Sequence, residues 1–192
     1  MNFKAYDILS SLVPGFLGVL AVLQLLEMTF DKDLVIAYTA VAFLFGYILN
    51  TMASWLEDFY FWTWGGKPSN KLIDGKGIWK VRLYAPHIKT LLLADCHTPN
   101  PTNEQMFSIA FRKANGTKDT RVEDFNANYA FARVLLTTVL LSSIFLLVQN
   151  PSNWQYWAVL VPMTFIVWLR CKQRAYYFAK EVLSVYLKSK MP

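Results

Sequence analysis

The chain has 192 residues, of which 55% are apolar, 16% are aromatic and only 17% are charged, with a net charge of +6. Soluble domains carry roughly 25% charged residues, so this composition disfavours a soluble enzyme and excludes disorder, a coiled coil and collagen. Two cysteines, Cys96 and Cys171, are too few for a disulfide framework. The composition predicts an all-α membrane protein of one domain's length.

Two uncharged runs near the N-terminus are each long enough to cross a bilayer. They span about residues 8–26 and 34–56, and a hydrocarbon core about 30 Å thick takes about 20 helical residues. The short linker 27–33 makes residues 1–56 a transmembrane hairpin. Small residues would let these helices approach each other or neighbouring protomers closely: Ser11, Gly15, Gly18, Ala42 and Gly46.

Residues 57–128 are predicted to form a small, mainly helical cytoplasmic region. The aromatic run that follows Trp55 ends at Gly65-Gly66, residues 71–77 are predicted to be an exposed loop, and the alternation at 79–84 is a weak strand signal. Pro86 suits the first turn of a helix that ends near Asp95.

Two capping boxes mark expected helix starts in the second half of this region. Thr102 with Gln105 predicts the start of a helix that ends near Ala114, and Thr120 with Glu123 predicts the start of another. No breaker follows the second box before Arg133. The helix from Thr120 is therefore expected to continue directly into the third crossing, over about 43 Å.

A third uncharged run, 134–169, is too long for one crossing. The segment Gln149-Asn-Pro-Ser-Asn153 is a turn signature that divides it. We therefore expect a second transmembrane hairpin, residues 129–169, with helices at about 129–148 and 154–169. The fold class predicted is four transmembrane helices arranged as two hairpins.

The basic tail, residues 170–192, is predicted to be an amphipathic helix. It carries six positive residues and one negative residue, with apolar positions at helical spacing from Ala175 to Tyr186. Such a helix would continue the fourth crossing, lie on anionic lipid or bind a partner, and the sequence leaves these alternatives open.

The distribution of charge predicts the orientation of the hairpins. Of 19 Lys and Arg residues, 18 lie in the N-terminus, the central region and the tail, and Lys32 alone lies in the two hairpin loops. The positive-inside rule then places both termini in the cytoplasm. Residues expected at the membrane interface are Trp55, Trp62, Trp64, Arg133, Trp154, Trp157 and Trp168.

Candidate catalytic and metal-binding residues are few. Arg82 and His87 have the R-x4-H spacing of a family of helical ribonucleases, but Pro86 argues against a helix through the pair. Asp95-Cys96-His97 lacks the further ligands of a zinc site. Neither a nucleophilic triad nor paired carboxylates can be argued, so we expect a chain that is not an enzyme and holds no metal or cofactor.

Two segments carry a resemblance to a known family. The opening YDILSSLVPGF, residues 6–16, and YAFAR, residues 129–133, resemble small membrane proteins of bacterial anti-phage defence loci. Size, four crossings and a central cytoplasmic part are similar to the KwaA family, the membrane subunits of the two-component Kiwa system. This resemblance implies a homo-oligomeric inner-membrane sensor that responds to phage and partners a soluble, DNA-binding KwaB subunit. It assigns no functional residue.

Two hypotheses of function follow. The first is a non-enzymatic, oligomeric sensor or scaffold of the bacterial inner membrane that couples a membrane event to a soluble cytoplasmic effector. Its partner-binding residues would include Arg112, Lys113, Arg170, Lys172 and Arg174. The alternative is a ligand-gated pore that depolarises the cell. The positive-inside bias already explains the basic surface, so no direct contact with nucleic acid is inferred.

Overall fold

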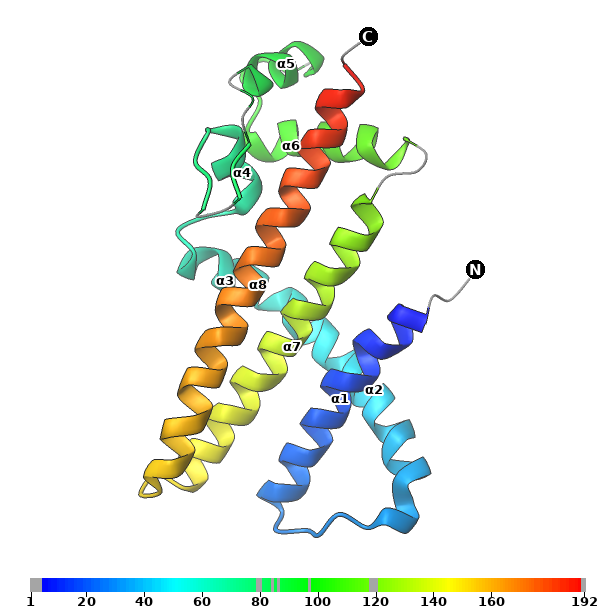
Figure 1. The fold of residues 1–192 in the computed structure, drawn as a ribbon, viewed down its shortest axis with the longest axis vertical. Coiled ribbons are helices and arrows are strands. Elements are labelled where there is room, and N and C mark those ends of the chain that lie inside the picture. Colours follow the sequence, from blue (N-terminus) through cyan, green and yellow to red (C-terminus); the bar gives the residue numbers. More distant parts are fainter. Residues whose placement is uncertain are drawn as a thin grey trace. The chain divides into compact units, whose positions relative to one another are not determined.

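The computed structural model describes residues 5–78, 81–83, 85, 87–96, 98–117 and 121–190. The described part is helical, and it contains no strand beyond an isolated bridge between Ile78 and Val81. The prediction of an all-α fold is therefore confirmed. The elements are α1 (Ala5–Leu25), the 3-10 turn η1 (Lys32–Leu34), α2 (Val35–Trp55), α3 (Glu57–Thr63), α4 (Pro68–Ile73), α5 (Ile88–Asp95), α6 (Asn103–Asn115), α7 (Val122–Gln149) and α8 (Trp154–Lys188) (Figure 1).

The chain divides into two compact units. We call Met1–Asp58 with Ala130–Cys171 the apolar unit, and Phe59–Tyr129 with Lys172–Pro192 the basic unit. By sequence, the apolar unit contains four Lys and Arg against six Asp and Glu, a net charge of −2. The basic unit contains fifteen against seven, a net charge of +8. The helices α7 and α8 each contribute one part to either unit.

Within the apolar unit, α1 and α2 form a hairpin, and the two helices cross each other (Figure 1). The crossing lies at Gly15 of α1 and Gly46 of α2. A Cβ atom on Gly15 would lie 1.8 Å from the carbonyl oxygen of Ala42, and a Cβ on Gly46 would lie 1.9 Å from that of Ser11. The two backbones are therefore in direct contact, as the small residues predict. Phe30 of the linker stacks on Tyr38 and contacts Phe16 edge-on, which fills the wider end of the hairpin.

In the part of the chain that the structure describes, two helices are long and apolar enough to cross a membrane: Lys32–Trp55, which joins η1 to α2, and Val122–Gln149, which is α7. Only 17% and 39% of their most apolar windows are buried inside the protein. The apolar surface of α2 therefore faces mostly outwards, whereas most residues of α7 after Tyr129 are buried or half-buried. A shorter apolar stretch, Ser11–Leu25, lies in α1.

The core of the apolar unit is small. One buried cluster joins α1 and α2 through Val19, Leu23 and Ala42. A second joins α2 and α7 through Leu49, Ala53 and Val134. The helices α7 and α8 are linked by a hydrogen bond of 3.0 Å between the hydroxyl groups of Ser143 and Thr164.

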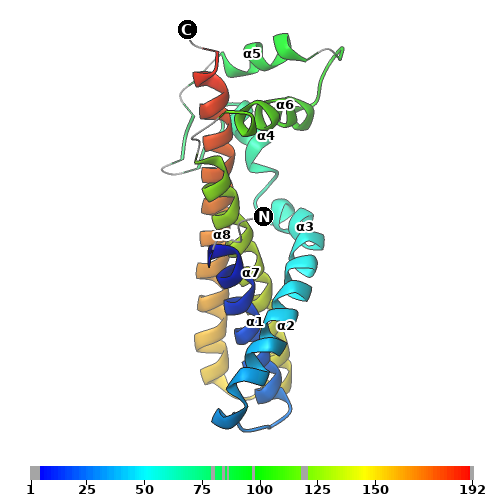
Figure 2. The same cartoon turned by 90° about the vertical axis from the view of Figure 1, so that its right-hand side faces the viewer.

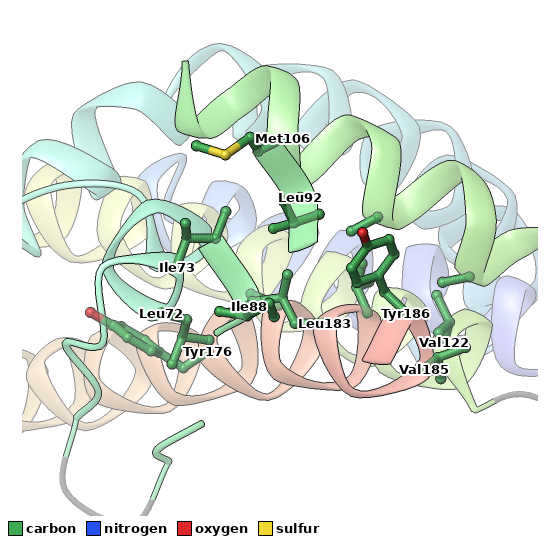
Figure 3. Packing of buried hydrophobic residues seen from close by; sticks show 14 of the residues in the cluster. Leu72, Ile73, Ile88, Leu92, Met106, Val122, Tyr176, Leu183, Val185 and Tyr186 are labelled. Carbon is green, nitrogen blue, oxygen red and sulfur yellow. The ribbon is translucent and has the colours of Figure 1, made fainter. Parts of the chain in front are cut away.

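The basic unit, in contrast, is built around a conventional hydrophobic core (Figure 3). Fifteen buried residues of the described chain form one cluster, which draws on α4, α5, α6, the start of α7 and the second half of α8. Figure 3 shows Leu72 beside Tyr176, and Ile88 beside Leu183. Figures 1 and 2 show α6 lying across the C-terminal half of α8, and α5 beside the C-terminal end of that helix.

The structure selects one of the alternatives for the tail. The α8 helix runs unbroken from Trp154 to Lys188, so the tail continues the preceding apolar helix. Its apolar face is covered by the protein itself, because Ala175, Ala179 and Leu183 are buried in the core. That face is therefore not free for lipid or for a partner.

Local predictions in the basic unit have mixed outcomes. The capping box of Thr102 and Gln105 is present, with both hydrogen bonds, and opens α6 as expected. The predicted loop at 71–77 is wrong in its first half, because α4 extends to Ile73 and buries Leu72 and Ile73. The box at Thr120 and most of the strand signal at 79–84 lie outside the described residues.

Candidate functional site

A charged cluster lies in the basic unit where α5, α6 and α8 end. The carboxylate of Asp95, the last residue of α5, accepts a hydrogen bond from Lys113 Nζ at 2.7 Å through one oxygen and from Lys190 Nζ at 2.7 Å through the other. The Tyr186 hydroxyl donates to the same carboxylate at 2.9 Å and lies 3.1 Å from the Leu91 carbonyl oxygen. We call these four residues the Asp95 cluster: Asp95, Lys113, Tyr186 and Lys190.

The electrostatics of the Asp95 cluster favour the ionised carboxylate. Hydrogen bonds from Lys113 and then from Lys190 hold the pKa of Asp95 well below its ordinary value. Burial, followed by the hydrogen bond to Asp95, raises the pKa of Tyr186. The Lys113 ammonium also lies 5.6 Å from the centre of the Tyr186 ring, a cation–π distance. One carboxylate shared by two ammonium groups leaves the cluster with a net positive charge.

A second set of polar contacts braces the other side of α6. Asp74, at the end of α4, accepts hydrogen bonds from Lys89 of α5 at 2.7 Å and from Asn103 of α6 at 3.0 Å. Lys67 pairs with Glu104 at 2.9 Å. These contacts engage Asp74 and Glu104, and with Asp95 they bring to three the number of the seven acidic residues of the basic unit that pair with side chains of neighbouring segments. Exposed positive side chains in the described part include Lys76, Arg82, Arg112 and Lys188.

The predicted partner-binding residues differ in exposure and in their contacts. Arg112 and Lys113 are exposed on α6, but Lys113 is engaged by Asp95. Lys172 and Arg174 are half-buried on α8 in the basic unit. Burial and the neighbouring Lys71 ammonium lower the pKa of Lys172. Arg170 is exposed and belongs to the apolar unit.

The predicted interface residues have different surroundings. Trp55, Trp62 and Trp154 are among the most exposed large side chains, and Trp62 stacks on Phe59 with ring centres 5.9 Å apart. Trp157 is exposed and donates its indole N–H to the Pro151 carbonyl. Trp168 is half-buried and stacks on Phe165. Trp64, by contrast, is 2% exposed and presents no ring to the surroundings.

Arg133 takes part in a junction that the sequence reading did not find. Its guanidinium donates to the carboxylate of Glu57, the first residue of α3, and to the Ser54 hydroxyl at 3.1 Å. Sequence analysis places Arg133 in the headgroup layer instead. The sequence does contain a signal for this pair. Glu57 directly follows the second apolar run and Arg133 directly precedes the third, so two antiparallel helices would place both residues at the same end of the helix pair.

The histidines and cysteines do not form a metal site in the described part of the chain. No three His, Cys, Asp or Glu side chains gather among the residues that the structure describes. His87 is the exposed residue before α5, and His97 lies outside the described residues. Comparisons with protein-family models, with curated proteins and with solved structures find no match to this chain.

Proposed function

We propose that this chain is a non-enzymatic scaffold or sensor of the bacterial inner membrane, with four crossings and both termini in the cytoplasm. One observation carries the membrane part of the proposal. In the described chain, 27 of the 30 exposed large apolar side chains belong to the apolar unit, and the other three are Phe59, Trp62 and Leu93. Exposed apolar surface of this extent in one unit supports a membrane interface.

The four-crossing topology draws on both hairpins of the apolar unit. Beside the two helices that are long and apolar enough, α1 and the first half of α8 also carry exposed apolar side chains, such as Leu17 and Ile166. The segment that joins α1 to α2 and the segment that joins α7 to α8 contain one basic residue between them, Lys32. This asymmetry supports a cytoplasmic basic unit.

The basic unit supports the scaffold part of the proposal. It has its own core and a net charge of +8, and of its large apolar side chains that the structure describes only Phe59, Trp62 and Leu93 are exposed. A partner would therefore be recruited through charged and polar contacts, which favours a soluble protein with an acidic surface. The resemblance to the KwaA family motivates the further proposal of a homo-oligomer that acts in anti-phage defence with a KwaB-like effector.

Topology is tested by labelling single cysteines in spheroplasts with an impermeant maleimide, in a Cys96→Ala, Cys171→Ala background. Lys32→Cys and Ser152→Cys, both exposed in the connecting segments, are expected to label from outside. Lys76→Cys, exposed in the basic unit, is expected to label only after lysis. Labelling of Lys76→Cys and Ser152→Cys from the same side would refute the four-crossing map.

The partner is tested by co-expression with the product of the neighbouring gene and affinity capture from membranes. The double variant Arg112→Glu, Lys188→Glu is expected to lose capture, because it reverses two exposed charges of the basic unit. Lys32→Glu makes the same chemical change in the apolar unit and is expected to leave capture unchanged. A chain that protects cells from phage without any second protein would contradict the scaffold proposal.

A further inference from the structure

An apolar crevice of about 300 Å³ lies within the apolar unit, between the first hairpin and α7. Its walls come from three helices, and include Gly18 and Ala21 of α1, Phe45 and Leu49 of α2, and Leu141 and Ser142 of α7. A volume of this size is at the lower end of the range for small-molecule binding pockets. The crevice is therefore large enough to hold part of a ligand.

Small side chains create the space. The ring of Phe45 lies against Gly18, where an added Cβ would come within 2.5 Å of it. Ala21 and Ser142 also line the crevice, and their small side chains fill little of it. A larger side chain at Ala21 or Ser142 would fill the crevice without entering the backbone contact at Gly15 and Gly46.

Contacts at both ends of the helices bound the crevice. Towards one end, the Gln149 side-chain amide donates to the Leu25 carbonyl at 3.1 Å. Towards the other, Arg133 binds Ser54, and Leu49 and Ala53 pack on Val134. The first hairpin is thus fixed to α7 at each end, and the space between these contacts is a defined feature of the unit.

The chemistry of the walls excludes water as the occupant. Thr138, the threonine beside the crevice, donates its hydroxyl proton to the Val134 carbonyl at 3.0 Å. Cavities with apolar walls stay dry, and an unfilled void forfeits the dispersion energy of its walls. Val22 and Phe145 line the crevice and are exposed, so the crevice opens onto the outer apolar surface. An occupant is therefore apolar and enters from the surrounding medium.

We propose that this crevice binds one acyl chain of a membrane phospholipid. The inference rests on the proposed function, because that proposal makes hydrocarbon the medium at Val22 and Phe145. On the order of ten chain carbons fit, if each takes roughly the 30 Å³ that one water takes in the liquid. The bound chain lies against α1, α2 and α7, between the contacts that fix the first hairpin to α7 at each end.

The test uses vesicles of a phosphatidylcholine that carries a diazirine near the middle of one acyl chain. The protein is reconstituted and irradiated, and the adducts are mapped by peptide sequencing in a mass spectrometer. Adducts are expected on Leu49, which is 3% exposed and so shielded from lipid that merely surrounds the protein, and on Leu141. Ile36 and Ile166, which are exposed, report the surrounding lipid.

A filled crevice provides the matched comparison. In the Ala21→Leu, Ser142→Leu variant, adducts on Leu49 and Leu141 are expected to fall at least tenfold, while those on Ile36 and Ile166 stay unchanged. Ala158→Leu adds the same bulk at an exposed position of α8 and is expected to change nothing. Should the double variant fail to assemble, Ala21→Leu and Ser142→Leu are measured singly, and each is expected to reduce the two adducts.

The outcomes separate the two proposals. Labelled Ile36 and Ile166 with unlabelled Leu49 and Leu141 would overturn the acyl-chain site and leave the membrane proposal standing. Equal labelling of Leu49 in the wild-type chain and the filled variants would also overturn the site. Absence of adducts at all four positions would overturn the membrane proposal itself, and the site with it.

Discussion

The two units of this chain use the same kinds of side chain in opposite ways. In the basic unit, leucines, valines and tyrosines gather in one buried cluster of fifteen described residues. In the described part of the apolar unit, two buried clusters contain three residues each, and 27 large apolar side chains are exposed. Burial within the protein stabilises the first arrangement, whereas the exposed apolar surface of the second suits the membrane surroundings proposed above.

This difference shows what holds each unit together. In lipid, helices gain little from burying leucine, because acyl chains are equally apolar, and close backbone packing and hydrogen bonds take its place. In the proposed membrane setting, the contacts expected to matter most in the apolar unit are the Gly15–Gly46 crossing, the Ser143–Thr164 hydrogen bond and the Arg133 junction. The basic unit relies on apolar volume, with ion pairs at the helix ends.

The largest effect is expected at the helix crossing of the apolar unit. Gly15→Ala places a methyl group 1.8 Å from the Ala42 carbonyl oxygen. The nearest atoms, in Ala42 and Gly46, belong to the backbone and cannot move aside as a side chain could. The helices must separate, at a cost of about 3 kcal/mol or more. Helix propensity alone predicts the opposite sign, since Ala is better than Gly by about 1 kcal/mol. The fraction of monodisperse protein after detergent extraction, followed by size-exclusion chromatography, measures the loss.

Gly116→Ala is the control for that change. Gly116 lies in the basic unit with a φ of −77°, and an added Cβ would be 3.6 Å from the nearest atoms. This variant is expected to behave like the wild-type chain. Equal recovery of Gly15→Ala and Gly116→Ala would show that α1 and α2 do not cross at Gly15.

A matched pair of leucine truncations tests the comparison directly. Leu183 is buried in the core of the basic unit, and Leu44 is 62% exposed in the apolar unit. Leu183→Ala is expected to cost about 3 kcal/mol, from lost transfer energy and the cavity left behind. Leu44→Ala is expected to cost less than about 0.5 kcal/mol, as at other exposed sites. Thermal unfolding in nanodiscs, followed by near-ultraviolet circular dichroism, measures both.

Either of two results would break the comparison. A large loss in Leu44→Ala would place Leu44 against protein, for example a second copy of the chain. A negligible loss in Leu183→Ala would mean that the second half of α8 is not part of a packed core. Only the combination of a large loss at Leu183 and a small loss at Leu44 agrees with the described burial.

The sequence predicts the parts of this fold that depend on neighbouring residues. The Gly15 and Gly46 contact follows from small residues at helical spacing, and α6 follows from its capping box. The sequence could not show that α4, α5 and α6 cover the apolar face of the tail. An apolar face with a 3.6-residue period indicates that the face is buried, but it does not indicate what buries it. The α4 helix is too short for periodicity to be recognised.

The candidate sites were harder to predict than the fold. Arg133 and Glu57 are 76 residues apart in the chain, so no local pattern relates them. The sequence brings Asp95 to attention only within Asp95-Cys96-His97, whereas its partners are Lys113 of α6, Tyr186 of α8 and Lys190, which follows α8. Basic residues such as Lys113 were assigned to an external partner, because sequence alone does not reveal an internal carboxylate.

The smallest expected effect concerns the ion pairs of the basic unit. The folded-state pKa of Asp95 lies below the ordinary value near 3.8, owing first to Lys113 and then to Lys190. A carboxylate with a depressed folded-state pKa contributes stability above the unfolded-state pKa of about 4 and loses it as the pH falls through the folded-state pKa. Because the cluster is partly open to solvent, this contribution is expected to be under about 1 kcal/mol.

Asp95→Asn isolates that contribution, because the amide keeps the shape of the side chain but does not titrate. Its melting temperature is expected to lie slightly below that of the wild-type chain at pH 7, and the gap is expected to narrow as the pH falls below about 4. Glu104→Gln, which alters the exposed pair with Lys67, is the control for removing one surface charge. A gap for Asp95→Asn that stays constant from pH 7 to pH 3 would mean that the Asp95 carboxylate is not paired in the folded chain, and that α5, α6 and α8 are held together by their apolar contacts alone.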